Sequence, residues 1–254
     1  MSAKKTPSVM LMLIALFVGS TLYFSGESIY RSQATEQART VADLVENIGK
    51  WASQYRGLWV KDSKGKQIDL GSHLDTLVVT PSVANNSEIT PEEANDIMQF
   101  HLKNPALIQR EISDLTEKSA STTKFRITSD KYMNPKNAPN AFETHAINEI
   151  RKTNARELTK VENGELHYAR ALVATEACMR CHDTAAKAPA AVRDLYPDQG
   201  YGYEVGKVAG VIAVTIPYQY SPQTLLNGFD LWAWLSFAGL LLVLAIAFRS
   251  KSSK

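Results

Sequence analysis

The residues of this chain most able to do chemistry are its two cysteines and the histidine after the second, in the motif Cys178-Met179-Arg180-Cys181-His182. Two thiols separated by two residues can add to the two vinyl groups of a haem, and the adjoining histidine then lies under the iron as an axial ligand. We therefore expect one covalently bound haem c, attached through Cys178 and Cys181 and ligated by His182. The sequence carries no carboxylate pair, nucleophile elbow or phosphate-binding loop, so an enzyme is not expected.

Three other chemistries use a Cys-x-x-Cys pair. A thioredoxin-like redox couple opens a helix after a buried strand in an alternating α/β frame, and the sequence shows no such alternation. A structural zinc site needs four ligands, whereas this motif supplies at most three crowded ones. A structural disulfide would close a very small loop and so constrain the unfolded chain little. The motif therefore favours covalent haem attachment.

The sixth iron ligand is open at this point. His167 lies on an expected strand that leads into the motif, and His145 follows a loop rich in asparagine and proline. Met133, immediately before that loop, is the best thioether candidate. His73 and His101 are the other histidines, and each of these side chains also has a plainer interpretation as a surface, hydrogen-bonded or packing residue.

Two uncharged and mostly apolar runs, residues 9–24 and 231–248, lie on either side of the part of the chain that carries the motif. Each is close to the ~20 residues that cross a bilayer as a helix. We therefore predict two transmembrane helices, at residues 7–26 and 229–248.

Each run also has an alternative interpretation. The first could be a cleaved signal peptide, but Tyr23, Phe24 and Glu27 stand where small residues would be needed for cleavage. The second could be a buried core helix, but Trp232 and Trp234 at one end are typical of a membrane interface. Retained membrane spans are the favoured prediction for both.

The distribution of charge predicts an orientation. The tails at residues 1–6 and 249–254 contain lysine and arginine but no acid, which by the positive-inside rule places both termini in the cytoplasm. The domain at residues 27–228 would then lie in the periplasm, anchored to a bacterial inner membrane. Residues 27–230 bear 23 basic and 26 acidic residues, a balance that gives no footprint for nucleic acid.

Hydrophobic periodicity and turn residues outline the elements of this domain. Apolar residues at three- and four-residue steps predict an amphipathic helix at 31–56, which would project from the membrane. Thr90 followed by Pro91 and two glutamates predicts a helix that starts there and runs toward His101. The remaining predictions are helices at 106–115 and 141–153, strands at 77–80, 125–128, 166–173 and 208–216, and a loop at 134–140.

The loop at 134–140 has asparagines alternating with prolines, whose ordinary role is turn formation through hydrogen bonds from side chain to backbone. We expect it also to shape one wall of the haem pocket. Candidates to neutralise the haem propionates are Arg126, Lys131 and Arg170.

Four separated stretches resemble the single-haem, PAS-like periplasmic sensor domains that occur ahead of bacterial chemoreceptors and histidine kinases and as stand-alone proteins. They are WASQYRGLWVK at 51–61, KNPALIQREIS at 103–113, FRITSDKYMNPKNAPNAFE at 125–143, and the stretch at 166–217 that contains CMRCH. The resemblance implies an α+β fold, in which haem c lies against an antiparallel PAS-like sheet flanked by helices and a long membrane-proximal helix. Some relatives use a cysteine as sixth ligand, which this sequence excludes, and others use methionine, histidine or water.

The haem motif, the predicted membrane spans and the resemblance are compatible with two functions. The first is a redox or small-ligand sensor, in which a change at the iron alters the helix at 31–56 and reaches a partner protein, because we expect no cytoplasmic signalling module after the second span. The second is an electron carrier docked to a membrane redox complex, which would need two strong axial ligands. The resemblance also implies that a homodimer could form through the membrane-proximal helices.

Overall fold

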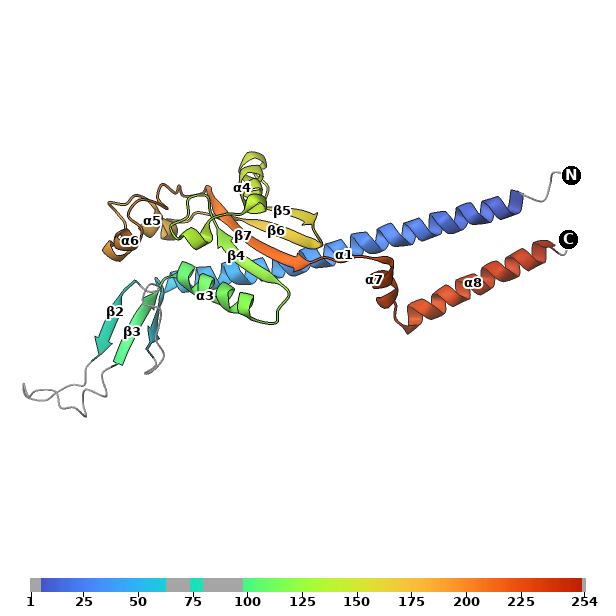
Figure 1. Ribbon diagram of the computed structural model, residues 1–254, viewed down its shortest axis with the longest axis horizontal. Coiled ribbons are helices and arrows are strands. Elements are labelled where there is room, and N and C mark those ends of the chain that lie inside the picture. The colour runs from blue at the N-terminus through green and yellow to red at the C-terminus, as the bar shows by residue number, and fades with distance from the viewer. Residues whose placement is uncertain (1–5, 63–73, 80–97, 253–254) are drawn as a thin grey trace, which may run out of the picture. The chain divides into compact units, whose positions relative to one another are not determined.

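The computed structural model describes residues 6–62, 74–79 and 98–252 (Figure 1). The chain divides into two compact units, one formed by Met1–Ala34 with Tyr218–Lys254 and the other by Thr35–Pro217. Helices and antiparallel strands both contribute to the second unit. The predicted α+β class is confirmed.

A four-stranded antiparallel sheet in the order β4-β7-β6-β5 forms the centre of the Thr35–Pro217 unit. Two long strands, β6 and β7, pair from Glu165 opposite Pro217 to Val173 opposite Val208. The predicted strands at 125–128, 166–173 and 208–216 are confirmed. The bounds are Lys124–Thr128 for β4, Glu157–Glu162 for β5, Glu165–Val173 for β6 and Val208–Pro217 for β7.

Strand β5 was not predicted from the sequence. It is an edge strand with charged residues at both ends and none of its side chains fully buried, so it lacks the apolar alternation of a half-buried strand. Its signal is the turn that joins it to β6, because Asn163 and Gly164 have φ angles of 53° and 76°. Positive φ at both central residues is the type I′ turn of tight hairpins.

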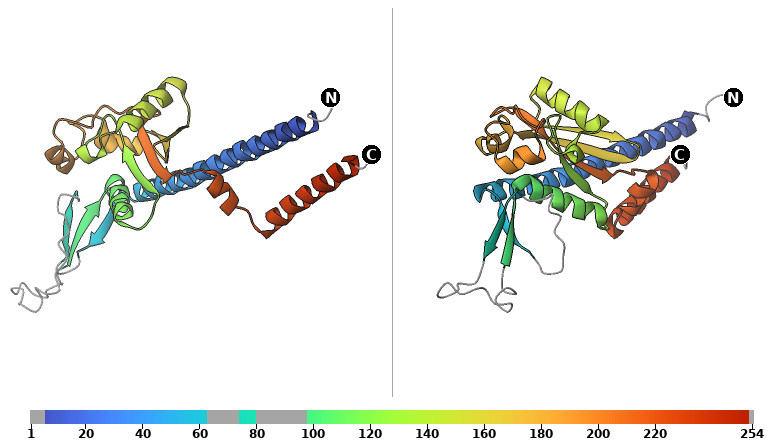
Figure 2. Two further views of the ribbon diagram at one scale, coloured as in Figure 1. Left: turned by 45° about the vertical axis from the view of Figure 1, so that its right-hand side comes forward. Right: turned by 60° about the vertical axis from the view of Figure 1, so that its left-hand side comes forward.

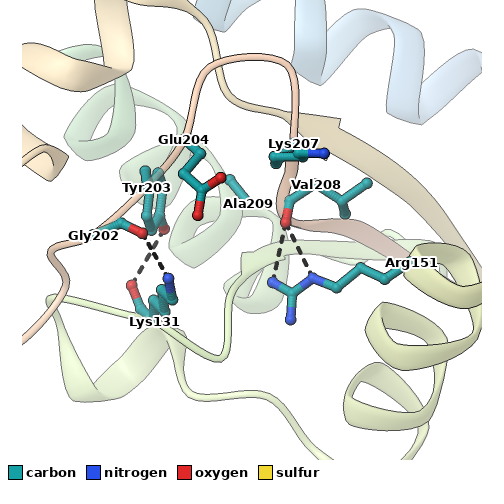
Figure 3. A pocket seen from close by; sticks show the side chains of 8 residues that line it. All are labelled: Lys131, Arg151, Gly202, Tyr203, Glu204, Lys207, Val208 and Ala209. Carbon is teal, nitrogen blue, oxygen red and sulfur yellow. Dashed lines mark hydrogen bonds between the residues drawn. The ribbon is translucent and has the colours of Figure 1, made fainter.

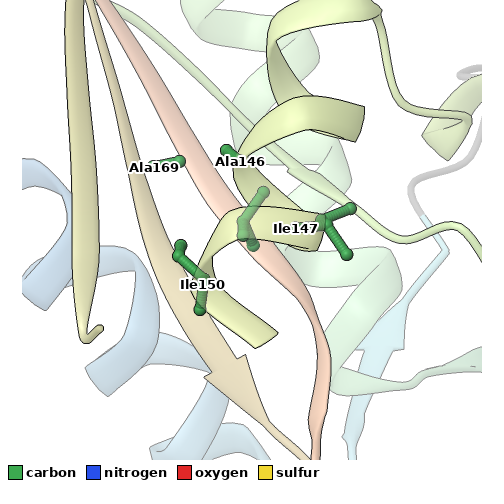
Figure 4. Packing of buried hydrophobic residues seen from close by; sticks show 5 residues of the cluster. Ala146, Ile147, Ile150 and Ala169 are labelled. Atoms are coloured by element: carbon green, nitrogen blue, oxygen red, sulfur yellow. The ribbon is translucent and has the colours of Figure 1, made fainter. Parts of the chain in front are cut away.

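Helix α4 (Ala141–Thr153) covers one face of this sheet. Ala146, Ile147 and Ile150 are at most 1% exposed and pack against Ala169 of β6 and Val211 of β7 (Figure 4). The helix begins with a capping box, in which the Asn140 side chain accepts from the Glu143 amide and the Glu143 carboxylate accepts from the Asn140 amide. The predicted helix at 141–153 is confirmed, with its apolar residues on the side that faces the sheet.

Helix α1 (Thr6–Gln54) packs on the opposite face of the sheet with its C-terminal part, as both views in Figure 2 show. Ala38, Ala42 and Ala52 in this C-terminal part of α1 are fully buried. The predicted helix at 31–56 and the first apolar run are therefore parts of one continuous helix. It is the long helix that the resemblance implied.

Alternation along β6 explains how one strand contacts both helices, since successive side chains point to opposite faces. Ala169 faces α4, whereas Arg170 faces α1 and hydrogen-bonds to Asp43, with Glu46 at 3.7 Å. The Arg170 side chain is only 4% exposed. A buried charge of this kind is strongly destabilising once its partner is lost, so the pair fixes the position of α1 on the sheet.

Tyr168 of β6 links this ion pair to a second contact with α1. The Tyr168 hydroxyl donates to Glu157 at 2.8 Å and accepts from Arg170 at 3.1 Å. Burial, together with its bond to Glu157, raises the pKa of Tyr168 to about 12, so the phenol stays a neutral donor. Arg39 binds the Glu157 carboxylate and lowers its pKa. Three side chains of the sheet are thereby tied to the helix that continues toward the N-terminal apolar run.

A smaller antiparallel sheet in the order β1-β3-β2 follows the end of α1. It consists of β1 (Leu58–Lys61), β2 (Thr76–Val79) and β3 (Met98–Lys103). The strand predicted at 77–80 corresponds to β2.

The predicted helix from Thr90 toward His101 is wrong in its second half, because His101 lies in β3 and pairs with β1 and β2 on either side. Residues 80–97 lie outside the described residues. A helix does begin at Asn104-Pro105, where the Asn104 side chain accepts from the backbone amide of residue 107 and proline follows the cap. This helix, α3 (Pro105–Lys118), confirms the prediction at 106–115.

The other unit contains the N-terminal part of α1, a short helix α7 (Pro222–Asn227) and α8 (Leu231–Ser252). Among the described residues, one helix has the length and mean hydropathy of a membrane span, and it lies near the N-terminus within α1. That property fits a membrane anchor and a signal sequence alike. In α8 the apolar stretch Leu231–Val243 is shorter, so the second span stays a prediction.

Within this unit, tyrosines join the chain that leaves β7 to α1. The Tyr220 hydroxyl donates to the backbone carbonyl of Tyr23 at 2.8 Å, and the Tyr30 ring lies 5.0 Å from the ring of Tyr218. Gly26 allows this approach, because a Cβ there would lie 2.4 Å from the Tyr220 hydroxyl oxygen. The entry and the exit of the sheet domain are thus held together.

We predict that Ile150→Ala lowers the free energy of unfolding by about 2–5 kcal/mol, because it leaves a cavity between α4 and the sheet. Leu115→Ala is the matched control, since Leu115 is 68% exposed on α3. Chemical denaturation of the detergent-solubilised chain measures both. Equal effects of the two substitutions would contradict the packing described for α4.

Candidate functional site

The Cys178-Met179-Arg180-Cys181-His182 motif forms a short helix, α5 (Glu176–His182), that starts just after β6 ends. Cys178 and Cys181 are three residues apart, so their side chains lie on one side of the helix. Both thiols are free and half-buried. The Sγ atom of Cys178 lies 3.4 Å from the Thr175 hydroxyl at the helix start, and burial raises the pKa of Cys181.

The imidazole of His182 is held by a backbone carbonyl. Its Nδ1 atom lies 2.6 Å from the carbonyl oxygen of Gly200. A carbonyl can only accept a hydrogen bond, so Nδ1 carries the proton and the lone pair of Nε2 is left for another partner. Burial also lowers the pKa of His182, which favours the neutral ring. Metal-ligating histidines usually have this arrangement, with the second ring nitrogen fixed by a carbonyl or carboxylate.

The ring of Tyr203 lies flat against the same imidazole. The two ring centroids are 4.2 Å apart and the planes differ by 10°. The backbone supports this stack, because the Tyr203 amide donates to the carbonyl of His182 at 3.0 Å and the Gly202 amide donates to that of Asp183 at 2.8 Å. His182 is therefore contacted at Nδ1 and on one ring face by a single short segment.

This segment, residues 199–203, is called here the Gly200 strap. It joins α5 to the loop after β4. The Tyr203 hydroxyl donates to Ser129 at 3.1 Å, and the ammonium group of Lys131 donates to the carbonyl of Gly202 at 2.6 Å. The Gln199 side chain donates to the carbonyl of Met133 at 2.7 Å. The residues after β4 therefore hold the strap, and the strap in turn contacts His182 on α5.

The loop with alternating asparagines and prolines stabilises the end of β4, next to the residues that contact the Gly200 strap. Its first half is a 3-10 turn, η2 (Pro135–Asn137), capped by the Asn134 side chain. The carbonyl of Asn137 accepts from the hydroxyl of Thr128 at 2.9 Å, which fixes the end of β4 just before the residues that contact the strap. Asn140 caps α4. Asn134 and Asn140 therefore do the turn and capping chemistry that the sequence indicated.

A pocket of about 170 Å³ adjoins the Tyr203 ring (Figure 3). Three cations line it, Lys131, Arg151 and Lys207, together with Glu204. The Arg151 guanidinium binds Asp130 at 2.5 and 2.8 Å and also donates to the carbonyl of Val208. Arg151 and Lys207 were not singled out from the sequence, because nothing in a linear pattern marks them as neighbours of the motif.

The three residues considered for the haem propionates lie in different places. Lys131 contacts the strap. The Arg126 guanidinium donates to the carbonyls of Lys136 and Ala138 in the asparagine-proline loop. Arg170 faces α1, where Asp43 neutralises it. Of the three, only Lys131 is next to the residues that hold His182.

The candidates for the sixth iron ligand are also spread out. His167 lies six residues before the end of β6, which is about 20 Å along the strand from α5. His145 is exposed on α4. Met133 is near the motif, since a Cβ on Gly200 would lie 2.1 Å from its Cγ atom. Met133 thus adjoins Gly200, the residue whose carbonyl contacts Nδ1 of His182.

Neither of the other two histidines is placed beside the motif. His101 is buried in the smaller sheet beside Thr76, and His73 lies outside the described residues. No group of three His, Cys, Asp or Glu side chains that could hold a metal ion occurs in the part of the chain that the structure describes.

We predict that Gly200→Ala displaces the strap and destabilises the chain by more than the strain of a left-handed alanine, which is about 1–2 kcal/mol. Gly200 has φ of +88° and abuts Met133, whereas Gly206 has φ of +81° and nothing within 4 Å of an added Cβ. Gly206→Ala is therefore the matched control. Thermal unfolding of the two variants measures the difference, and equal losses would contradict the packing of Met133 on Gly200.

Among solved structures, the chain is similar to one described as the crystal structure of the cyanobacterial heme-protein Tll0287. The two share 26% sequence identity, with a TM-score of 0.41, and the match covers 47% of this chain and 75% of that chain. No curated protein matches the chain.

A family model described as Tll0287-like matches residues 27–217. The match includes the four-stranded sheet, α5 and the Gly200 strap. Because it extends over well more than half of the 254 residues, the chain belongs to the Tll0287-like family.

Proposed function

We propose that the chain binds one haem c, joined to Cys178 and Cys181 by thioether bonds and ligated at the iron by Nε2 of His182. The observation that carries this proposal is the 2.6 Å hydrogen bond from Nδ1 of His182 to Gly200, which leaves Nε2 as the free donor atom. Two free thiols on the same side of α5 support it. The relative named a heme-protein adds to that support.

We further propose that the protein is a redox or small-ligand sensor and not an enzyme. A haem supplies an iron that changes oxidation state and, with an open sixth position, binds a small ligand. The chain's own part would be to hold the imidazole and to pass movement onward. A route for movement is supported by Arg170, which is eight residues before Cys178 on the chain and pairs with Asp43 of α1.

The proposed location is a bacterial inner membrane with the sheet domain in the periplasm. An apolar N-terminal part of α1, continuous with the helix on the sheet, supports an anchor that would transmit a displacement. The PAS-like sheet, a second span at 229–248 and cytoplasmic termini complete the proposal. The basic residues of both tails support this orientation.

The optical spectrum of the full chain, matured with c-type haem machinery, tests the sensor proposal. We expect the reduced protein to bind carbon monoxide rapidly, because a sensor needs a vacant or weakly held sixth position. A six-coordinate, low-spin spectrum that does not respond to the gas would contradict sensing and favour an electron carrier, which keeps two strong ligands.

We propose a second copy of the chain as a partner, through an apolar stripe on α1. The stripe is formed at steps of three and four residues, which is the a/d spacing of a coiled coil. Its members on the helix are Val41, Leu44, Ile48 and Trp51, and Tyr55 continues the spacing in the turn just after Gln54. Leu44, Trp51 and Tyr55 are 61%, 49% and 63% exposed, so the sheet does not cover them.

The residues beside the stripe support the same partner. Thr40, Asn47 and Gln54 flank it on the side away from the sheet, and none is charged, so two parallel copies would meet without repulsion there. Anchoring in one membrane would also align two copies of α1 in parallel.

We predict that Trp51→Glu raises the dissociation constant of the dimer at least about tenfold, or ~1.4 kcal/mol, because it buries a charge in the seam. Light scattering in detergent measures the association. Leu115→Glu is the control, since Leu115 is an exposed apolar residue on α3, outside the stripe. A wild-type chain that is monomeric at all concentrations would contradict this partner.

A further inference from the structure

We propose that Tyr203 is a positioning residue that fixes the plane of the His182 imidazole and thereby lowers the reduction potential of the iron. This inference rests on the proposed haem attachment. Tyr203 could not be assigned a role from the sequence, because it lies 21 positions after His182 in a segment without regular structure.

The geometry shows what Tyr203 adds to the contact with Gly200. A histidine ring rotates in a broad, shallow well about the bond from Cβ to the ring. The hydrogen bond at Nδ1 holds one edge of the ring, and the parallel ring of Tyr203, 4.2 Å away, blocks rotation toward its side. Together the two contacts leave the imidazole one orientation.

Tyr203 is itself held firmly enough to do this. Its hydroxyl donates to the Ser129 hydroxyl at 3.1 Å and lies 3.2 Å from the carbonyl of Lys131. Ser129 is buried and donates in turn to the carbonyl of Ala209, on β7. The ring that faces His182 is therefore anchored to the longest strand of the sheet.

The orientation has a chemical consequence. The bond from Nδ1–H to a carbonyl makes the imidazole a stronger electron donor, and stronger donation stabilises the oxidised iron. If the ring were free to rotate, this bond would be weakened for part of the time. Loss of the Tyr203 ring should therefore raise the midpoint potential and spread the imidazole over several orientations.

The test uses the full chain, matured with covalent haem, in three variants. Tyr203→Leu removes the stacked ring, and Tyr203→Phe keeps the ring but removes the bonds to Ser129 and Lys131. Tyr201→Leu is the control, because Tyr201 belongs to the same strap and donates to the carbonyl of Tyr196, just after α6 (Ala190–Leu195), not to His182 or its stack. The readouts are the midpoint potential and the width of the ferric electron paramagnetic resonance signals.

We expect an upward shift in potential and broadened signals for Tyr203→Leu, a smaller change for Tyr203→Phe, and wild-type values for Tyr201→Leu. Haem-loaded Tyr203→Leu with wild-type potential and signals would overturn the role of Tyr203 and leave the haem site intact. An equal shift in Tyr201→Leu would overturn it too, since the effect would then belong to the strap as a whole. Wild-type chain without covalent haem would instead overturn the proposed function.

Discussion

The hydrogen bond between Nδ1 of His182 and the carbonyl of Gly200 is the interaction on which the rest of the site depends. It decides which ring nitrogen carries the proton and so which one keeps a free lone pair, the atom that the proposed haem iron would use. The carbonyl can reach the ring because Gly200 adopts φ of +88° against Met133, a position with no room for a side chain. A single glycine therefore links the protonation of the histidine to the packing of the loop after β4.

The site is connected to helix α1 through the sheet. β7 anchors Ser129 and hence Tyr203, β6 leads into α5, and Arg170 on β6 is paired with Asp43 on α1. A buried arginine cannot lose its partner cheaply, so α1 must follow β6 or the ion pair must be exchanged for Glu46 at 3.7 Å. Asp43 and Glu46, three residues apart on α1, thus both lie within ion-pair distance of Arg170.

Much of the fold could be predicted from the sequence where local chemistry agrees with tertiary packing. Helix α4 has its cap, its proline-rich entry and its apolar face in the sequence, and its bounds agree with the prediction. β6 and β7 are apolar enough to be recognised alone. β5 has charged ends and is defined by its Asn163-Gly164 turn, and β3 pairs on both sides although an acidic helix-start signal precedes it. In those two strands tertiary pairing decided the outcome.

The candidate site also has a part that the sequence predicts and a part that it does not. Cys178, Cys181 and His182 are contiguous, so their chemistry is visible in the sequence. The Gly200 strap is irregular, and its value lies in contacts with residues some 20 and 70 positions away, which no periodicity announces. His145 and His167 were plausible by position along the chain, but the strand length and the outward face of α4 separate them from the motif.

Intact-mass spectrometry of the denatured chain, produced with c-type haem maturation, tests the central claim most directly. The account predicts that the wild-type chain carries the added mass of one haem and that the Cys178→Ala, Cys181→Ala double variant has the mass of the polypeptide alone. A wild-type chain with no added mass, or a double variant that keeps the haem, would contradict it.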